Sequence, residues 1–127
     1  MKKYDCEILI GTISYNIKVS GKKIDGKVHY ETEALIDGQK ELAIELLQET
    51  TSDFNIDIFN FVINVAGIKG SELASLMGST PSSISQARRG KTPLSKTAWK
   101  LFTLVMMSYL SKDQNRAIDK MALKPAA

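Results

Sequence analysis

A twenty-residue stretch from Gly70 to Arg89 constrains the fold of this chain more than any other part of the sequence. Ala74 is its fifth residue, Gly78 its ninth and Ile84 its fifteenth. Two short helices that cross steeply need a small residue where they touch, a glycine in the tight turn between them and an apolar anchor on the second helix. The spacing therefore predicts a helix-turn-helix, two short helices joined by a tight turn.

The second helix of this unit has clear start and stop signals. Thr80 is a good N-cap, Pro81 suits the first helical position, and Gly90 is the residue type that ends a helix. The short or flexible polar side chains between them fall on the outer face of a two-turn helix: Ser82, Ser83, Ser85 and Gln86. Such a helix lies in the major groove of DNA with its N-terminal residues against base edges, so the pattern favours DNA reading.

Charge is divided unevenly along the chain. Residues 1–54 hold seven Lys against ten Asp and Glu, a balance of −3, whereas residues 55–127 hold ten Lys and Arg against four acids, a balance of +6. The two sum to the net charge of +3. This asymmetry indicates different partners for the two halves.

The first 36 residues have the pattern of β-structure. Residues 4–10, 13–19 and 27–36 alternate between apolar and polar side chains, and an Asp25-Gly26 pair marks a turn before the third segment. This pattern predicts a three-stranded antiparallel meander. Three strands with one apolar face need cover to be stable.

A helix over residues 37–51 is predicted to cover this sheet, with Asp37 at its N-cap. Its apolar residues form one stripe: Leu42, Ala43, Leu46 and Leu47. The polar connector that follows places a domain boundary between residues 52 and 53. We expect a small β-rich domain at 1–52, for partner binding or dimerisation, and a helix-turn-helix domain with a C-terminal helix at 53–127.

The second half has helical periodicity throughout. Helices are predicted over residues 56–68, 71–78, 80–90 and 95–112, and residues 113–127 extend the last helix or add a final turn.

Residues 57–110 resemble the five-helix DNA-binding domain of the Cro/repressor (XRE) family. The pattern "ELASLMG...SSIS..RRGKTPLSKTAWKLF" is similar in particular to the C-terminal half of MqsA/YgiT-type antitoxins. The resemblance implies an α+β chain, with a small antiparallel β-meander plus helix at the N-terminus, followed by an all-α five-helix XRE-type helix-turn-helix domain. The family's N-terminal domain typically binds zinc through paired CxxC motifs. Cys6 is the only cysteine here, so we expect no metal and an apolar core in its place.

The resemblance also implies roles for individual residues. Ser82, Ser83 and Gln86 correspond to the positions that read bases in the family, and Pro81 lies beside them. Gln pairs bidentately with adenine and Ser serves several bases. Lys69, Ser71 and Thr80 lie at helix starts that approach DNA phosphates in the family. The basic residues that would flank the groove and neutralise phosphates are Arg88, Arg89, Lys91 and Lys96. Double-stranded DNA is therefore the expected ligand.

The long helix carries more apolar surface than a small bundle needs. Helix-turn-helix proteins usually act as twofold dimers, so we interpret the surplus as a homodimer interface. Its predicted residues are Trp99, Phe102, Val105, Met106 and Tyr109. The alternative is that the N-terminal domain packs on this helix.

Several other functions are disfavoured by the sequence. Cys6 and His29 alone do not make a four-ligand zinc site, and no catalytic Ser/His/Asp set or phosphate-binding loop is present, so we expect neither an enzyme nor a cofactor. Residues 1–7 are too polar for a secretory signal, and no apolar run approaches the ~20 residues that span a bilayer. With one cysteine, a cytoplasmic protein is expected.

Three functional hypotheses follow. The first is an antitoxin-like repressor of its own operon, which binds a palindromic operator as a dimer and holds a partner protein, such as a basic toxin, through its acidic N-terminal half. The second is a stand-alone regulator from a phage or mobile element, without a toxin. The third is a protein-interaction module that keeps the helical shape only.

Overall fold

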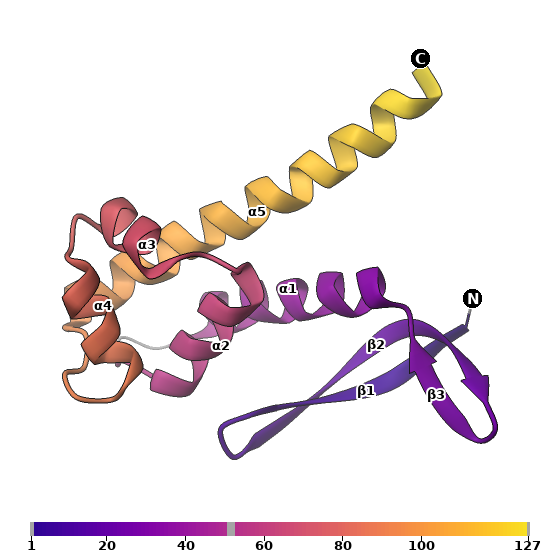
Figure 1. Ribbon diagram of the computed structural model, residues 1–127, viewed down its shortest axis with the longest axis horizontal. Helices are drawn as coiled ribbons and strands as arrows, with labels where there is room; N and C mark the ends of the chain where they lie inside the picture. Colours follow the sequence, from indigo (N-terminus) through magenta and orange to yellow (C-terminus); the bar gives the residue numbers. More distant parts are fainter. Residues whose placement is uncertain (1, 51–52, 127) are drawn as a thin grey trace.

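The protein is α+β, with a three-stranded antiparallel sheet followed by five helices (Figure 1). The computed structural model describes residues 2–50 and 53–126, with side chains described for these residues except 113–126. The strands are β1 (Lys2–Ile10), β2 (Ile13–Ile24) and β3 (Lys27–Tyr30). The helices are α1 (Thr32–Glu49), α2 (Ile56–Ala66), α3 (Gly70–Met77), α4 (Pro81–Arg88) and α5 (Lys96–Ala126).

The predicted antiparallel meander is confirmed. The strand order is β1-β2-β3, with Cys6 opposite Ile17 and Lys22 opposite His29. Asp25 and Gly26 form the second turn with φ of 52° and 78°, the left-handed pair that suits a two-residue hairpin.

Tyr30 joins the two outer strands of the sheet. Its hydroxyl donates a hydrogen bond to the backbone carbonyl of Asp5 on β1, although β2 lies between them. The pKa of the Tyr30 phenol is raised above its ordinary value of 10.0, first by burial and then by Cys6 and Asp5. The neutral phenol is therefore the form that the folded sheet favours.

The start of α1 corrects one sequence expectation. The third strand was predicted to reach residue 36, but β3 ends at Tyr30 and α1 begins at Thr32, so Asp37 lies inside the helix and does not cap it. The helix runs through Gly38 because the lack of a side chain there lets it lie close to the sheet. A Cβ at Gly38 would lie 3.0 Å from Ile17 Cδ1 and 3.6 Å from Val19 Cγ2.

Helix α1 has buried residues in two cores. Leu42 and Leu46 pack with Ile10 in a small cluster against the sheet. Ala43 and Leu47, their immediate neighbours, pack in the core of the helical half. The predicted stripe is thus confirmed as buried. The domain division at residues 52 and 53 stays a prediction, since residues 51 and 52 lie outside the described residues.

Aromatic side chains form the centre of the helical core. Trp99 and Phe102 on α5 are stacked, with ring centroids 5.3 Å apart and an interplanar angle of 11°. Phe59 on α2 lies 4.7 Å from Phe102, and Phe54, just before α2, meets Trp99 edge-on at 5.4 Å. These contacts fix α2 and α5 against each other and give α3 and α4 a surface to pack on.

The predicted five-helix domain is wrong. Four helices, α2 to α5, follow residue 53, and the total of five is reached only by counting α1. The last segment adds no separate element, because residues 111–124 contain neither Gly nor Pro and α5 continues through them to Ala126. Although α5 has 31 residues, neither it nor any other helix in the described ranges is long and apolar enough to cross a membrane.

Candidate nucleic-acid interface

The predicted pair of short helices is present as α3 and α4, joined by residues 78–80. Ala74 and Ile84 are each 1% exposed, so the small contact residue and the apolar anchor lie where the spacing placed them. Gly78 has a φ of 64°, which an L-residue with a side chain rarely adopts. The Ser79 amide donates to the Ala74 carbonyl at 2.8 Å and the Gly78 amide to the Ser75 carbonyl at 3.2 Å, which closes the end of α3.

Helix α4 begins as the sequence predicts. Thr80 Oγ1 accepts a hydrogen bond from the Ser83 amide at 3.2 Å, and the Thr80 and Ser83 hydroxyls lie 3.0 Å apart. Pro81 occupies the first helical turn. This cap fixes the exposed N-terminal turn of α4 without using Ser82.

Helix α4 also ends as the sequence predicts. Gly90 has a φ of 75°. Its amide donates to the Ala87 carbonyl at 3.2 Å, and the Lys91 amide donates to the Gln86 carbonyl at 3.0 Å. These two bonds form a Schellman motif, so the chain turns away sharply after Arg89.

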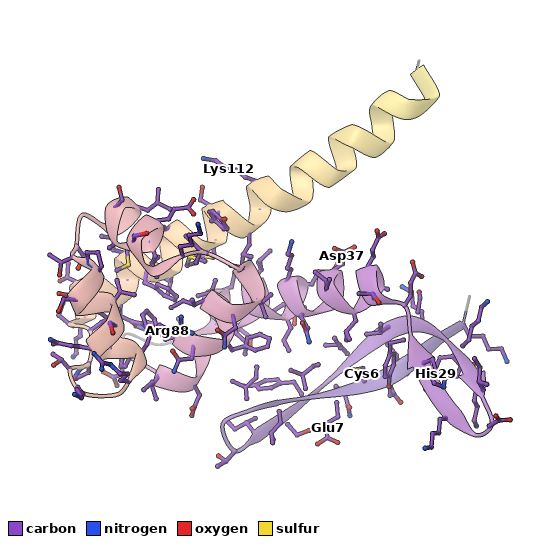
Figure 2. The ribbon with its side chains drawn as sticks, viewed as in Figure 1. Cys6, Glu7, His29, Asp37, Arg88 and Lys112 are labelled. Carbon is purple, nitrogen blue, oxygen red and sulfur yellow. The ribbon has the colours of Figure 1, made fainter. Side chains whose placement is uncertain are left out.

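Arg88 ties α4 to α2. Its Nη2 donates to Asn64 Oδ1 at 2.8 Å and its Nε donates to Asn60 Oδ1 at 3.3 Å. The side-chain amide of Asn60 donates in return to the Arg88 carbonyl at 3.1 Å. Figure 2 shows Arg88 beside α2. Together with the buried Ile84 and Ala87, these bonds hold α4 by its inner face.

The predicted base-reading residues divide into two groups. Pro81, Ser82 and Ser83 are exposed at the start of α4. Gln86 is half-buried, and its Oε1 accepts a hydrogen bond from Thr92 Oγ1 at 3.3 Å. Because Gln86 is half-buried and held by Thr92 while the first turn is exposed, the first turn of α4 is the part best placed to enter a groove.

Most of the predicted phosphate contacts are exposed. They are Lys69, Ser71, Thr80, Arg89, Lys91 and Lys96. Arg88 differs, because Asn60 and Asn64 of α2 already accept hydrogen bonds from its guanidinium. Between residues 58 and 112 Glu72 is the only acid, against seven Lys and Arg. The surface that carries α3 and α4 is thus strongly biased toward positive charge.

The predicted dimer interface is wrong for three of its five residues. Trp99, Phe102 and Met106 are at most 1% exposed and belong to the core of a single chain. Because α1 and α2 pack on this face of α5, these three residues are covered from within the chain, which is the alternative that the sequence also allowed, whereas Leu101 and Leu104 stay 39% and 52% exposed. Val105 and Tyr109 keep partial exposure.

Asn60 and Asn64 are site residues that sequence reasoning missed. Their spacing of four residues, in a helix whose other residues are apolar except Asp57, was the available signal, since it places two amides on one face of α2. Their partner, Arg88, lies 24 to 28 residues away and could not be assigned from spacing alone.

Cys6 and His29 lie on opposite faces of the sheet, as their register requires, and Cys6 is buried whereas His29 is exposed (Figure 2). Among the residues that the structure describes, no three or more His, Cys, Asp or Glu side chains are grouped as a metal site would require. Comparisons with family models, curated proteins and solved structures give no match for this chain.

Proposed function

We propose that this protein is a sequence-specific DNA-binding repressor that reads DNA with the first turn of α4. The observation that carries the proposal is the construction of this turn. Thr80 caps this turn, and Ile84 and Arg88 anchor the helix to the rest of the domain through its inner face. Pro81, Ser82 and Ser83 are exposed to solvent. Helices of this kind place their N-terminal residues against base edges.

The basic side chains around the pair of helices support the same proposal. Lys69 lies at the N-cap of α3 and makes no capping bond there, and Arg89, Lys91 and Lys96 follow the end of α4. All four are exposed. Neutralising phosphates with such groups supplies most of the affinity for DNA and makes it sensitive to salt.

The proposal includes a homodimer that binds a palindromic operator in the cytoplasm. One α4 reads only one half-site, and twofold dimers match the symmetry of palindromic sites. With Trp99, Phe102 and Met106 buried, the surface left on α5 for a second copy includes Val105 and Tyr109, next to the exposed Leu104 and to Leu76 of α3.

We further propose a protein partner for the N-terminal half, as in an antitoxin that represses its own operon. Five carboxylates recur at every fourth position of α1, and all are exposed: Glu33, Asp37, Glu41, Glu45 and Glu49. Such a row favours a basic partner. A regulator without a toxin is the second candidate, and a small basic reading frame beside the gene would decide between them.

The test is selection of bound sequences from a random duplex library, followed by fluorescence anisotropy on the selected site. A dimer that neutralises ~3–4 phosphates per protomer should lose roughly six decades of affinity per decade of salt. Ser82→Ala with Arg89→Ala should weaken binding to the selected site by at least about tenfold.

The matched control is Ser14→Ala with Lys27→Ala, which removes one hydroxyl and one positive charge from the sheet. We expect this variant to bind as the wild type does. If both variants weakened binding equally, α4 would not be the part that reads DNA. The same conclusion would follow if the wild-type protein bound DNA without sequence preference or without salt dependence.

A further inference from the structure

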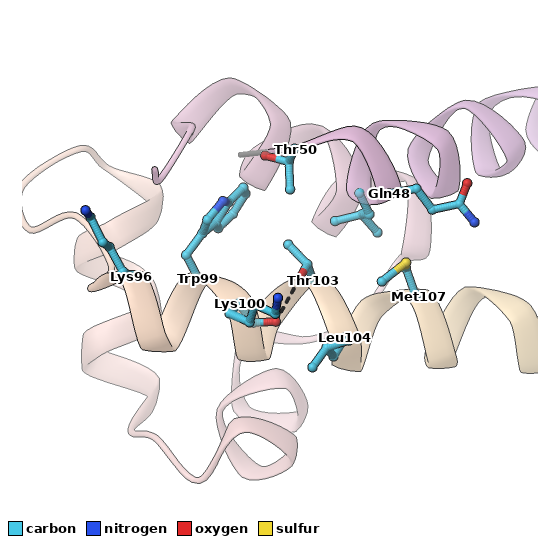
Figure 3. A pocket seen from close by; sticks show the side chains of 9 residues that line it. Gln48, Thr50, Lys96, Trp99, Lys100, Thr103, Leu104 and Met107 are labelled. Carbon is cyan, nitrogen blue, oxygen red and sulfur yellow. Dashed lines mark hydrogen bonds between the residues drawn. The ribbon is translucent and has the colours of Figure 1, made fainter. Parts of the chain in front are cut away.

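A pocket of about 350 Å³ lies between the end of α1 and the first half of α5 (Figure 3). Its walls are formed by Leu47, Gln48, Thr50, Lys96, Trp99, Lys100, Thr103, Leu104 and Met107. None of these residues belongs to α3 or α4. The pocket is therefore separate from the turn of α4 proposed to read DNA.

The lining combines an apolar base with a positively charged rim. Leu47 and Trp99 are 2% and 1% exposed, so their side chains form the base, with Met107 beside them. Lys96 and Lys100, one helical turn apart on α5, are both exposed at the rim. No lining residue is acidic. An apolar body in the pocket would thus place an attached anion near two ammonium groups.

Two further features favour an anion at this place. Lys96 is the first residue of α5, and the N-terminal end of a helix attracts negative charge. The Thr103 hydroxyl donates its proton to the Lys100 carbonyl at 2.7 Å, so the charged donors for an anionic ligand here are the two lysines. Gln48 adds an amide that can donate from the α1 side.

We propose that this pocket binds a small organic anion, a carboxylate or sulfonate on a compact apolar body. Ligand pockets span roughly 300–1,000 Å³ and combine apolar walls with few polar groups, and this one lies at the small end of that range. Lysine provides a compact positive charge for such an anion. Because α1 and α5 both line it, the ligand would contact the sheet-covering helix and the helical core at once.

The test is a fluorescence titration with anilinonaphthalene sulfonate, compared with its neutral analogue N-phenyl-naphthylamine. Trp99 is the only tryptophan of the chain and lines the pocket, so energy transfer from it to the bound probe accompanies binding. We expect the sulfonate to bind the wild type about tenfold more tightly than the neutral probe, because only the sulfonate gains charge-assisted contacts. Lys96→Gln with Lys100→Gln should abolish that difference.

The matched control is Lys27→Gln with Lys112→Gln, which removes the same charge from the sheet and from the groove beside Tyr109. This variant should keep the preference for the sulfonate. Equal binding of the two probes to the wild type would overturn the proposal. A preference for the sulfonate that survives in the Lys96/Lys100 variant, or that is lost in the control variant, would overturn it as well. The titrations contain no DNA, so their outcome is independent of whether α4 reads DNA.

Discussion

The sheet and the helical half of this protein are stabilised by cores of very different depth. Around Phe59 and Phe102, all five helices and Phe54 contribute side chains, and both residues are 0% exposed. Around Leu42, one helix meets a sheet, and the buried cluster is limited to Ile10, Leu42 and Leu46 among the described residues. The comparison shows that α1 is the element common to both regions, because its adjacent residues Leu42 and Ala43 lie in different cores.

The largest effect is expected from Phe102→Ala in the helical core. Removing a buried aromatic ring that packs against Phe59 and Trp99 leaves a cavity, and such changes cost about 3–5 kcal/mol. This is a large fraction of the free energy of unfolding of a small domain, so the urea midpoint followed by circular dichroism should fall steeply. A small shift would show that the aromatic cluster is not the main source of stability.

A smaller effect is expected from Leu42→Ala, which opens a cavity between α1 and the sheet. The residue is 5% exposed and has few buried partners, so we expect a loss near the lower end for such changes, about 2–3 kcal/mol. Amide hydrogen exchange should accelerate in β1 and β2 more than in α2. Equal acceleration in α2 would show that the two cores unfold as one unit.

The smallest effect is expected from Tyr30→Phe, which removes the hydrogen bond to Asp5, and the difference from the wild type should shrink at alkaline pH. The folded protein raises the pKa of this phenol, so the stability that the neutral form contributes is complete below the ordinary value of 10.0 and is lost as pH rises through the folded-state pKa. Urea midpoints measured from about pH 9 to pH 11 should therefore fall more steeply in the wild type than in the variant. Tyr4→Phe, on the same sheet, is the control and should leave the wild-type slope unchanged.

The features that were predictable from the sequence depend on local spacing. Alternation along residues 4–10 and 13–19 predicted the first two strands, because side chains in a strand point to opposite faces in turn. The positions of Ala74, Gly78 and Ile84 predicted α3, the turn and α4, because the steric demands of that unit are met within twenty residues.

The features that were not predictable depend on contacts between distant segments. The third strand was predicted to run to residue 36 and the helix to begin at Asp37, but α1 begins at Thr32 and packs on the sheet with Gly38 close to Ile17 and Val19. The apolar residues of α5 do not reveal whether a second chain or α1 covers them. The bonds of Arg88 to α2 likewise follow from the packing of the two helices, since arginines after a serine-rich helix suit phosphate equally well.

The way α4 is attached has a consequence for how this protein could diversify. Its attachment uses Ile84, Ala87 and Arg88, whereas Pro81, Ser82 and Ser83 face outward. Of the outward residues, Ser82 takes part neither in the cap nor in the contacts of the inner face. Under the proposed DNA-reading role of α4, substitutions at Ser82 change what the helix recognises at little cost in folding stability, so binding preference and stability can evolve independently in this helix.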